Sequence, residues 1–208
     1  MKRKDFSKLK ITVQKEKDSY FEHEDFIAGV APNLRGINST MYLQTPLETK
    51  ISSDSFTKEN ITPEIELSIF LNESLRAIEK GFEAKFTIDT IVSELSFETK
   101  IGENHFDEIA KMRAARMLWA KLIKQFNPKN QRSFALKINA IITTSFNALP
   151  AILGGCQQIT SKDTEHLIFI EETGITKTID PWAGATYLEK RTEEITDKSW
   201  LLFKKNSI

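Results

Sequence analysis

The chain has 208 residues, of which 40% are hydrophobic and 28% charged, as expected of a globular domain with one buried core. Its 29 basic residues balance its 29 acidic residues, so no net field favours nucleic acid or an anionic membrane surface. The single cysteine, Cys156, cannot form an internal disulfide, which predicts a reducing, cytoplasmic setting. No apolar run approaches a membrane span, and neither an export signal nor an organelle presequence is indicated.

Residues 1–28 are expected to form a charged N-terminal arm, because charged residues recur there without an apolar period. The simplest interpretation is a solvated arm, and docking to a partner is the alternative. From Gly29 to Tyr42, turn-forming residues around short apolar pieces predict an irregular loop. Residues 51–62 are rich in Ser, Thr, Asp, Lys and Asn, which indicates a linker.

A helix is predicted to begin at Pro63, which suits a first helical turn, and apolar residues then recur at helical spacing. Gly81 is expected to end it. A short helix is predicted over 88–95 after Thr87 as its cap, followed by a brief strand over 96–101.

The clearest predicted element is a helix from Asn104, its N-cap, to Gln125, because this segment is rich in helix formers and has no Gly or Pro. Its apolar residues surround much of its circumference, so we expect it to be covered on more than one side. Residues 133–143 make the best strand. Helices alternating with strands predict an α/β fold with parallel strands. Further elements are expected at 148–153, at 167–170, which is either helical or extended, and at 186–205.

Four blocks of the sequence occur together in one protein family. They are GVAPNLRG (Gly29–Gly36) with TMY (Thr40–Tyr42), the run Glu108–Asn130, ILGGCQQ (Ile152–Gln158) and EETGITKTIDPWAG (Glu171–Gly184). Together they resemble the substrate barrel of methylmalonyl-CoA mutase, a cobalamin-dependent isomerase in which the acyl-CoA passes along the axis of a (β/α)8 barrel. Such a barrel needs ~250 residues. The resemblance therefore implies a partial or truncated TIM-type barrel over 29–208, in which the linker replaces the early barrel strands.

The resemblance also implies where ligands would be held. Its substrate-binding positions are Thr40, Met41, Lys50 and Ser96. The positions that it implies at the rim of the cofactor face are Gly154, Gly155 and Gln157. A double glycine can form a backbone nest for an anion, but after a helix it is as often a C-cap and a close packing turn.

Several positions that bind substrate in that family are changed here. Lys50 takes the place of a phosphate-binding arginine and lacks its bidentate fork, and Ser52 takes the place of a tyrosine. Glu94 replaces an arginine, and this charge reversal would repel phosphate. Asn139 and Ile141 stand where the family has His and Gln. We therefore assign no catalytic residue to this chain.

The resemblance implies adenosylcobalamin as the family cofactor, held by a separate domain with an Asp-x-His-x-x-Gly motif. None of His23, His105 and His166 has a glycine three residues later. We therefore expect that this chain alone does not bind cobalamin, and no metal site is predicted.

Two other features have alternative interpretations. Arg113 and Arg116, three residues apart on the long helix, would form either a phosphate clamp or ties to carboxylates of neighbouring elements, and we favour the ties. Cys156 lacks a nucleophile motif, so a small buried residue is the favoured interpretation.

The sequence thus predicts a shortened, catalytically degenerate mutase family member that acts as a noncatalytic or partner subunit. In this family a heterodimer often includes one subunit without an active site. The expected partner is a full-length mutase subunit, or the chain self-associates, and acyl-CoA remains a candidate ligand. The alternative is a contribution to the isomerisation of methylmalonyl-CoA to succinyl-CoA, or of a related acyl-CoA, by completing a barrel with another chain. A decayed product without a stable fold is the third possibility.

The predicted loss of early strands has a physical consequence. Inward apolar residues such as Ile138, Ala140 and Ile142, or their alternates, are expected to be only partly covered. Exposed strand edges and apolar patches drive association, so we expect self-association or marginal stability.

Overall fold

The computed structural model describes residues 21–51 and 61–206. Most of the expected arm over 1–28, most of the expected linker over 51–62, and Ser52 lie outside the described residues. The described end of the arm nevertheless belongs to the folded body and contains the 3-10 turn η1 (Glu22–Asp25). Its buried residues are Phe21, His23 and Ala28.

The strands form one parallel sheet of four, in the order β1-β4-β3-β2. The bounds are β1 (Glu48–Ile51), β2 (Ser96–Lys100), β3 (Lys137–Ile142) and β4 (Gln158–Ser161). β1 pairs with the last strand rather than with β2, which follows it in the chain. Ring closure produces this kind of order, because it makes the first and last strands neighbours. The sheet is therefore compatible with part of a β/α barrel that is open between β1 and β2.

The described part of the chain contains fewer than eight strands, as the sequence predicted, and no closed barrel. The strand expected over 133–143 is shorter than predicted, because residues Gln131–Phe134 form the 3-10 turn η2 before β3 begins. The strand expected over 96–101 corresponds to β2.

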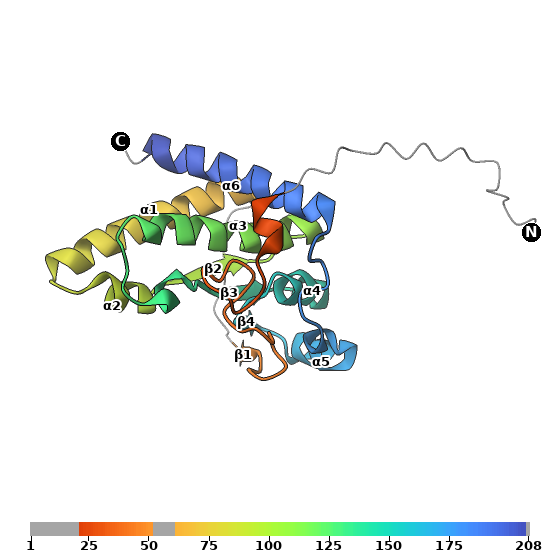
Figure 1. The fold of residues 1–208 in the computed structure, drawn as a ribbon. Helices are drawn as coiled ribbons and strands as arrows, with labels where there is room; N and C mark the ends of the chain where they lie inside the picture. The colour runs from red at the N-terminus through yellow and green to blue at the C-terminus, as the bar shows by residue number, and fades with distance from the viewer. Residues whose placement is uncertain (1–20, 52–60, 207–208) are drawn as a thin grey trace, which may run out of the picture.

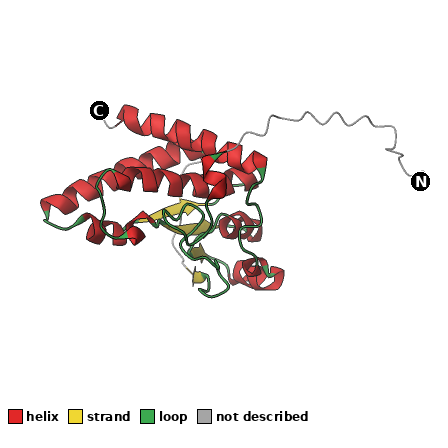
Figure 2. Ribbon diagram, in the orientation of Figure 1, coloured by secondary structure: helices red, strands yellow, loops and turns green. Residues whose placement is uncertain are grey.

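Helices alternate with these strands, as an α/β fold requires (Figure 2). The helix expected from Asn104 to Gln125 is confirmed, with Asn104 as its N-cap and Gln125 as its C-cap. The segment 167–170, for which the sequence allows either a helix or an extended form, is helical. The helices are α1 (Pro63–Glu83), α2 (Ile88–Ser93), α3 (His105–Lys124), α4 (Ser145–Leu153), α5 (Thr164–Thr173), the 3-10 turn η3 (Ile175–Lys177) and α6 (Thr186–Asn206).

Gly81 does not end α1, contrary to the sequence prediction. The helix continues to Glu83, and a Cβ placed on Gly81 would lie 2.5 Å from the side chain of Ile91 on α2. The glycine therefore permits close approach of α2 to α1. The chain turns afterwards at Lys85, which has a positive φ of 64°.

The helix that ends at the double glycine begins earlier than expected. It starts at Ser145 rather than at residue 148, because Thr144 and Asn147 form a reciprocal capping box. The Thr144 hydroxyl accepts a bond from the Asn147 N–H at 3.3 Å, and the Asn147 side-chain oxygen accepts from the Thr144 N–H at 3.1 Å.

The helices form two layers over the sheet. α1 and α3 contact each other, and α6 packs across both of them as an outer layer (Figure 1). Residues of α3 are buried around its circumference, which confirms that it is covered on more than one side. The Trp119 indole N–H of α3 donates to the Ser133 carbonyl at 3.1 Å and fixes the segment that leads into β3.

The two faces of the sheet differ in chemistry. On the face toward the helices, Ile138, Ala140 and Ile142 are at most 1% exposed, so the expectation that these residues are only partly covered is wrong. Their alternates on the other face are mostly polar, and Ser96 and Lys137 are exposed there. We call this second face the open face.

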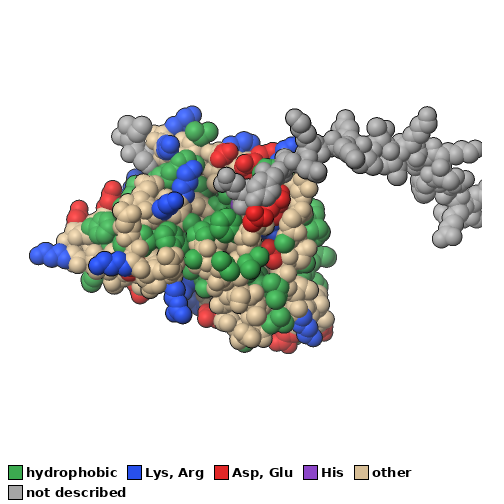
Figure 3. Space-filling view, in the orientation of Figure 1, with side chains coloured by type: hydrophobic (Ala, Val, Ile, Leu, Met, Phe, Trp, Pro, Cys, Tyr) green, Lys and Arg blue, Asp and Glu red, His purple; other side chains and the backbone are tan. Residues whose placement is uncertain are grey.

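Large hydrophobic side chains are also exposed elsewhere. Ile27, Val30 and Leu43, on the loop before β1, are each about half exposed or more. Figure 3 shows hydrophobic side chains gathered over the middle of the visible face, with charged side chains mainly around its rim. Among the described residues, no helix has the length and apolar character needed to cross a membrane.

Candidate functional site

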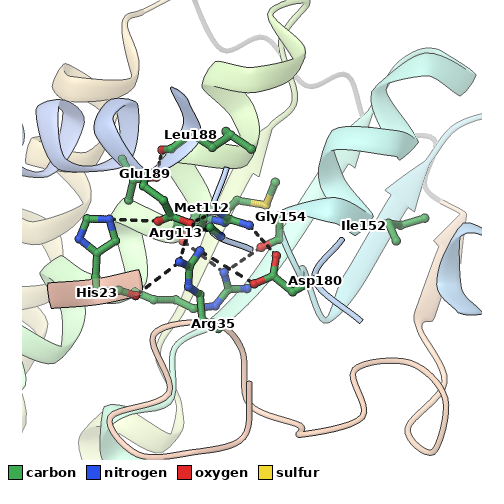
Figure 4. Close-up of polar contacts among 12 residues, drawn as sticks. His23, Arg35, Met112, Arg113, Ile152, Gly154, Asp180, Leu188 and Glu189 are labelled. Atoms are coloured by element: carbon green, nitrogen blue, oxygen red, sulfur yellow. Dashed lines mark hydrogen bonds and ion pairs between the residues drawn. The ribbon is translucent and has the colours of Figure 1, made fainter. Parts of the chain in front are cut away.

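A buried group of charged side chains, which we call the ion cluster, joins three of the sequence blocks (Figure 4). Its centre is Glu189 on α6, whose side chain is fully buried. Glu189 Oε1 lies 2.6 Å from Arg35 Nη2 and 3.0 Å from Arg113 Nη1, and Glu189 Oε2 lies 3.1 Å from His23 Nε2. Arg113 Nη2 also contacts Asp180 Oδ1 at 2.5 Å.

The ion cluster holds Glu189 in its charged form. Burial would raise the pKa of this carboxyl, but hydrogen bonds from His23 and Arg35 and the two guanidinium charges outweigh burial and lower the pKa to about 2. The Gly184 N–H donates to Glu189 Oε1 at 3.2 Å. The cluster thereby ties the loop around Arg35, the helix α3, the loop before α6 and α6 itself. This gives a physical reason for three of the four blocks to occur together.

Arg113 is confirmed as a tie to carboxylates, but Arg116 is bound differently from that interpretation. Arg116 Nη1 donates to the Gly154 carbonyl at 2.8 Å, and Nη2 donates to the Gly155 carbonyl. Burial lowers the pKa of Arg116 to about 10, so it remains charged near neutral pH. With their guanidinium groups occupied in this way, the two arginines do not form a phosphate clamp.

The same turn is tied to the TMY segment. The single Tyr42 hydroxyl proton is shared between the Cys156 carbonyl, 2.7 Å from Oη, and the Ile152 carbonyl, 3.2 Å from Oη. Burial raises the pKa of Tyr42 well above its usual value and raises the pKa of the Cys156 thiol to about 12. These shifts support the interpretation of Cys156 as a small buried residue, because its thiolate is disfavoured.

A small cavity of about 70 Å³ lies between these segments, lined by Met41, Tyr42, Gly155 and Gln157 among others. Gly155 has φ +77°, and a Cβ placed there would lie 3.1 Å from Met41 Cε. The Gln157 side chain accepts from the Ile138 N–H at 2.8 Å and donates to the Gly155 carbonyl at 2.9 Å. The side chain that the resemblance assigned to a ligand therefore bonds to the backbone.

The structure unites only part of the predicted site. Met41, Gly155 and Gln157 meet at the cavity, and Thr40 lies half-buried beside Met41 in the same loop. The turn before β4 lies at the amino ends of the strands, whereas parallel barrels carry their active sites at the carboxyl ends. Lys50 and Ser96 lie apart, both exposed, on the two edge strands β1 and β2.

A larger cavity of about 700 Å³ opens at the amino ends of β2 and β3. It lies between the loop after Gly29, the helix α2 and the turn η2. Asp89 on its wall accepts from the Lys129 N–H at 3.1 Å and from the Ser133 hydroxyl at 2.5 Å, and the bond from Ser133 lowers the pKa of Asp89. Sequence reasoning missed Asp89. Its only local signal is its position in the first turn after the Thr87 cap.

A second buried charge group, also missed, links α1, α3 and β2. Lys111 Nζ lies 2.7 Å from Glu108 Oε2 and 3.0 Å from Glu66 Oε2. The Thr99 hydroxyl donates to Glu66 Oε1 at 2.8 Å. Burial raises the pKa of Glu108 despite the nearby ammonium. The spacing of Glu108 and Lys111 was visible in the sequence, but their burial was not.

The described residues form a single sheet, and two of their three histidines are held by other protein groups. His23 is held by Glu189, and His166 Nδ1 lies 2.8 Å from the Ser161 hydroxyl. Within the described ranges, no group of three or more His, Cys, Asp or Glu side chains is placed to hold a metal ion.

A parallel sheet whose first strand pairs with its last, flanked by alternating helices, defines an α/β protein compatible with part of a β/α barrel. The family model for methylmalonyl-CoA mutase matches residues 47–166 and 160–207, so the chain belongs to the methylmalonyl-CoA mutase family.

Individual relatives agree with this assignment. The methylmalonyl-CoA mutase large subunit of Porphyromonas gingivalis is 33% identical over 186 residues, covering 74% of this chain and 26% of the relative. The large subunit of Streptomyces virginiae is 32% identical over 182 residues, covering 72% and 25%. The human mitochondrial methylmalonyl-CoA mutase is 34% identical over 166 residues, covering 64% and 22%. The chain therefore spans about a quarter of the length of these relatives.

Proposed function

We propose that this chain is a noncatalytic member of the methylmalonyl-CoA mutase family that acts as a partner subunit. The observation that carries the proposal is what the charged residues of the family blocks contact. Arg35 and Arg113 pair with Glu189 in the buried ion cluster, which orders the scaffold. Lys50 and Ser96, at implied substrate-binding positions, are exposed on opposite edges of the sheet. Among the described residues, the scaffold contacts are thus kept while the two implied substrate-binding positions lie apart.

The charge at the mouth of the larger cavity supports the same proposal. Glu94 is exposed between Ser93 and Leu95, which both line that cavity. A carboxylate in this position disfavours the phosphates of an acyl-CoA on its side of the cavity, whereas Arg132 and Lys137 line the same cavity with positive charge. Lys50, the remaining cation at an implied phosphate position, is a point charge on a free edge.

One observation favours the alternative, in which the chain contributes to isomerisation of an acyl-CoA by completing a barrel with another chain. The sheet is open between β1 and β2, and its open face is polar, as a chamber wall would be. The noncatalytic proposal remains the better supported one, because the altered residues Glu94, Asn139 and Ile141 lie on or beside that wall.

The test is an assay of succinyl-CoA formation from methylmalonyl-CoA with adenosylcobalamin. We expect no turnover by this chain alone and no change in turnover per intact chain when an intact mutase is mixed with it. A matched variant, Lys50→Arg with Glu94→Arg, restores the guanidinium fork at the first position and the positive charge at the second. Turnover by the unmodified chain, or a rise in turnover on mixing, would overturn the noncatalytic role and favour barrel completion.

A further inference from the structure

The strand β1 is the last strand on one side of the sheet (Figure 1). Among the described residues it pairs only with β4, toward which the Glu48 N–H donates to the Gln157 carbonyl at 3.2 Å. Alternate residues of a strand direct their backbone groups to opposite sides. The N–H and C=O of Thr49 and Ile51 therefore point away from β4, and all four residues of β1 are exposed.

The side chains of β1 alternate between the two faces of the sheet. Glu48 and Lys50 lie on the open face, and Thr49 and Ile51 lie on the helix-covered face. Ile51 is 52% exposed although it lies on the covered face. The edge thus combines outward-pointing backbone groups, two opposite charges and an apolar side chain. An edge strand with outward-pointing backbone groups is a template for pairing with another chain.

This edge can pair with the same edge of a second copy. A two-fold axis perpendicular to the sheet makes the two β1 strands antiparallel, in an isologous contact. With Thr49 opposite Thr49 of the second copy, the two residues exchange both N–H···O bonds. Ile51 then lies opposite Leu47 of the second copy. Leu47 comes directly before β1 and packs partly buried against the core, so the pairing covers the exposed Ile51 with another apolar side chain.

The charges of β1 favour this register over its neighbours. Glu48 of each copy lies opposite Lys50 of the other, in pairs without backbone hydrogen bonds, where facing side chains are closest. Unlike charges in this position stabilise strand pairing. A slip of two residues in either direction would place Lys50 opposite Lys50, or Glu48 opposite Glu48, and like charges directly opposite each other are destabilising.

We propose that a second copy of this chain binds along β1, with the two β1 strands antiparallel, Thr49 opposite Thr49 and Glu48 opposite Lys50. The two sheets continue one another, and their helix layers lie on the same side. Because β1 has only four residues, the dimer is in equilibrium with the monomer. This inference names a partner that the proposed function leaves open, but it rests on β1 and stands whether or not the chain is catalytic.

The first test is the mass of the chain in solution. Sedimentation of the 23.8 kDa chain from about 1 μM to about 1 mM should show a monomer that converts to a dimer. A mass that stays monomeric over this range would overturn the proposal. Association that continues beyond the dimer would also overturn it, because an isologous contact uses the edge of both copies.

Charge reversal tests the register. Glu48→Lys places like charges opposite each other in both facing pairs of a homodimer, and Lys50→Glu does the same with the opposite sign. Each variant should raise the dissociation constant of its homodimer at least about tenfold. In an equimolar mixture every facing pair is unlike again, so heterodimers should form with nearly the wild-type constant. Unaffected homodimers, or a mixture without heterodimers, would contradict the proposed register.

The double variant Glu48→Lys with Lys50→Glu is the matched control for these reversals. It exchanges the two charges within one chain and keeps unlike charges opposite each other, so it should dimerise like the wild type. If it is as weak as the single variants, the facing pairs are not those proposed.

Proline substitution tests the backbone pairing. Thr49→Pro removes an outward-pointing N–H and spares the bonds to β4, so the fold should persist while the dimer is lost. Thr49→Ala keeps the N–H and should remain dimeric. Circular dichroism of dilute samples checks that both variants fold. A folded Thr49→Pro variant that dimerises like Thr49→Ala would overturn the pairing.

Hydrogen exchange on the unmodified chain provides a check that needs no variant. Raising the concentration through the dimer transition should slow exchange at the amides of Thr49 and Ile51. Unchanged exchange at these amides while the mass doubles would show that association uses another surface. Because all these readouts are independent of turnover, failure here is distinguishable from failure of the noncatalytic role.

Discussion

The helix-covered face of the sheet and its open face are built on different chemistry. Behind the covered face, Ile138 packs in an apolar core, and farther out the charges of Arg113 and Glu189 are buried and paired. On the open face, Lys50 and Ser96 are exposed and unsupported by packing. Buried paired charges are costly to disturb, whereas exposed polar residues are not. The comparison indicates that the fold depends on the helix-covered side and that exposed positions on the open face can change with little effect on stability.

The variant Glu189→Gln tests the contribution of the ion cluster to stability, and the largest effect is expected there. It leaves two guanidinium groups and His23 around a neutral side chain in a buried place. We expect the free energy of unfolding to fall by about 3–5 kcal/mol, as when one member of a buried pair is removed. Urea denaturation measures this, with the exposed Glu193→Gln on the same helix as the control. Equal, small effects of the two substitutions would contradict the structural role of the cluster.

The pH dependence of stability sharpens the same point. The pKa of Glu189 is lowered to about 2 in the folded state from an ordinary value of 4.5. Its charge therefore stabilises the fold above pH 4.5, and this stabilisation is lost as the pH falls toward 2, by about 3 kcal/mol in total. The difference in unfolding free energy between the wild type and Glu189→Gln should shrink over that window. A constant difference would show that Glu189 does not titrate there.

The turn before β4 provides an intermediate effect. Gly155→Ala places a Cβ at φ +77° and within 3.2 Å of both Met41 and Arg116. Gly184→Ala is the matched control, since it has φ +71° but no atom within 4 Å. Backbone strain is common to both, so we expect Gly155→Ala to cost about 1–3 kcal/mol more, from overpacking. Thermal unfolding of the two variants measures the difference. Equal melting temperatures would mean that the turn and its neighbours shift enough to accommodate the added Cβ.

The smallest effect is expected on the open face. Lys50→Ala should change the free energy of unfolding by less than about 0.5 kcal/mol, because the side chain is exposed and at a sheet edge. Urea denaturation of a dilute sample measures this. A large loss would mean that the open face contributes to folding, and the contrast between the two faces would fail.

Local signals predicted much of this fold. The helix from Asn104 to Gln125 followed from helix formers and a cap. The alternation of Ser96, Phe97 and Glu98 also indicates a polar open face, whereas the expectation for the inward side was apolar residues. These features are local because they depend on neighbours a few residues apart.

The remaining features depend on contacts between distant segments. Gly81 is a signal for the end of a helix, but in the structure its missing side chain lets Ile91 of α2 pack closely against α1. Arg116 was expected to meet carboxylates and instead binds the carbonyls of a turn about 40 residues away, 38 and 39 in the two bonds. Nothing near Glu189 in the sequence marks it as the centre of a buried cluster. Only the packing of α6 across α3 creates that environment.

The position of Glu189 on α6 has a consequence for synthesis on the ribosome. The residue follows Arg35 by 154 positions and Arg113 by 76, so both arginines emerge long before their counterion. Until Asp180 and then α6 emerge, a folded intermediate would have to bury two positive charges without their carboxylate partners, which is strongly unfavourable. Compaction of the segments that contain Arg35 and Arg113 therefore waits for carboxylates that follow Arg113 by 67 and 76 positions.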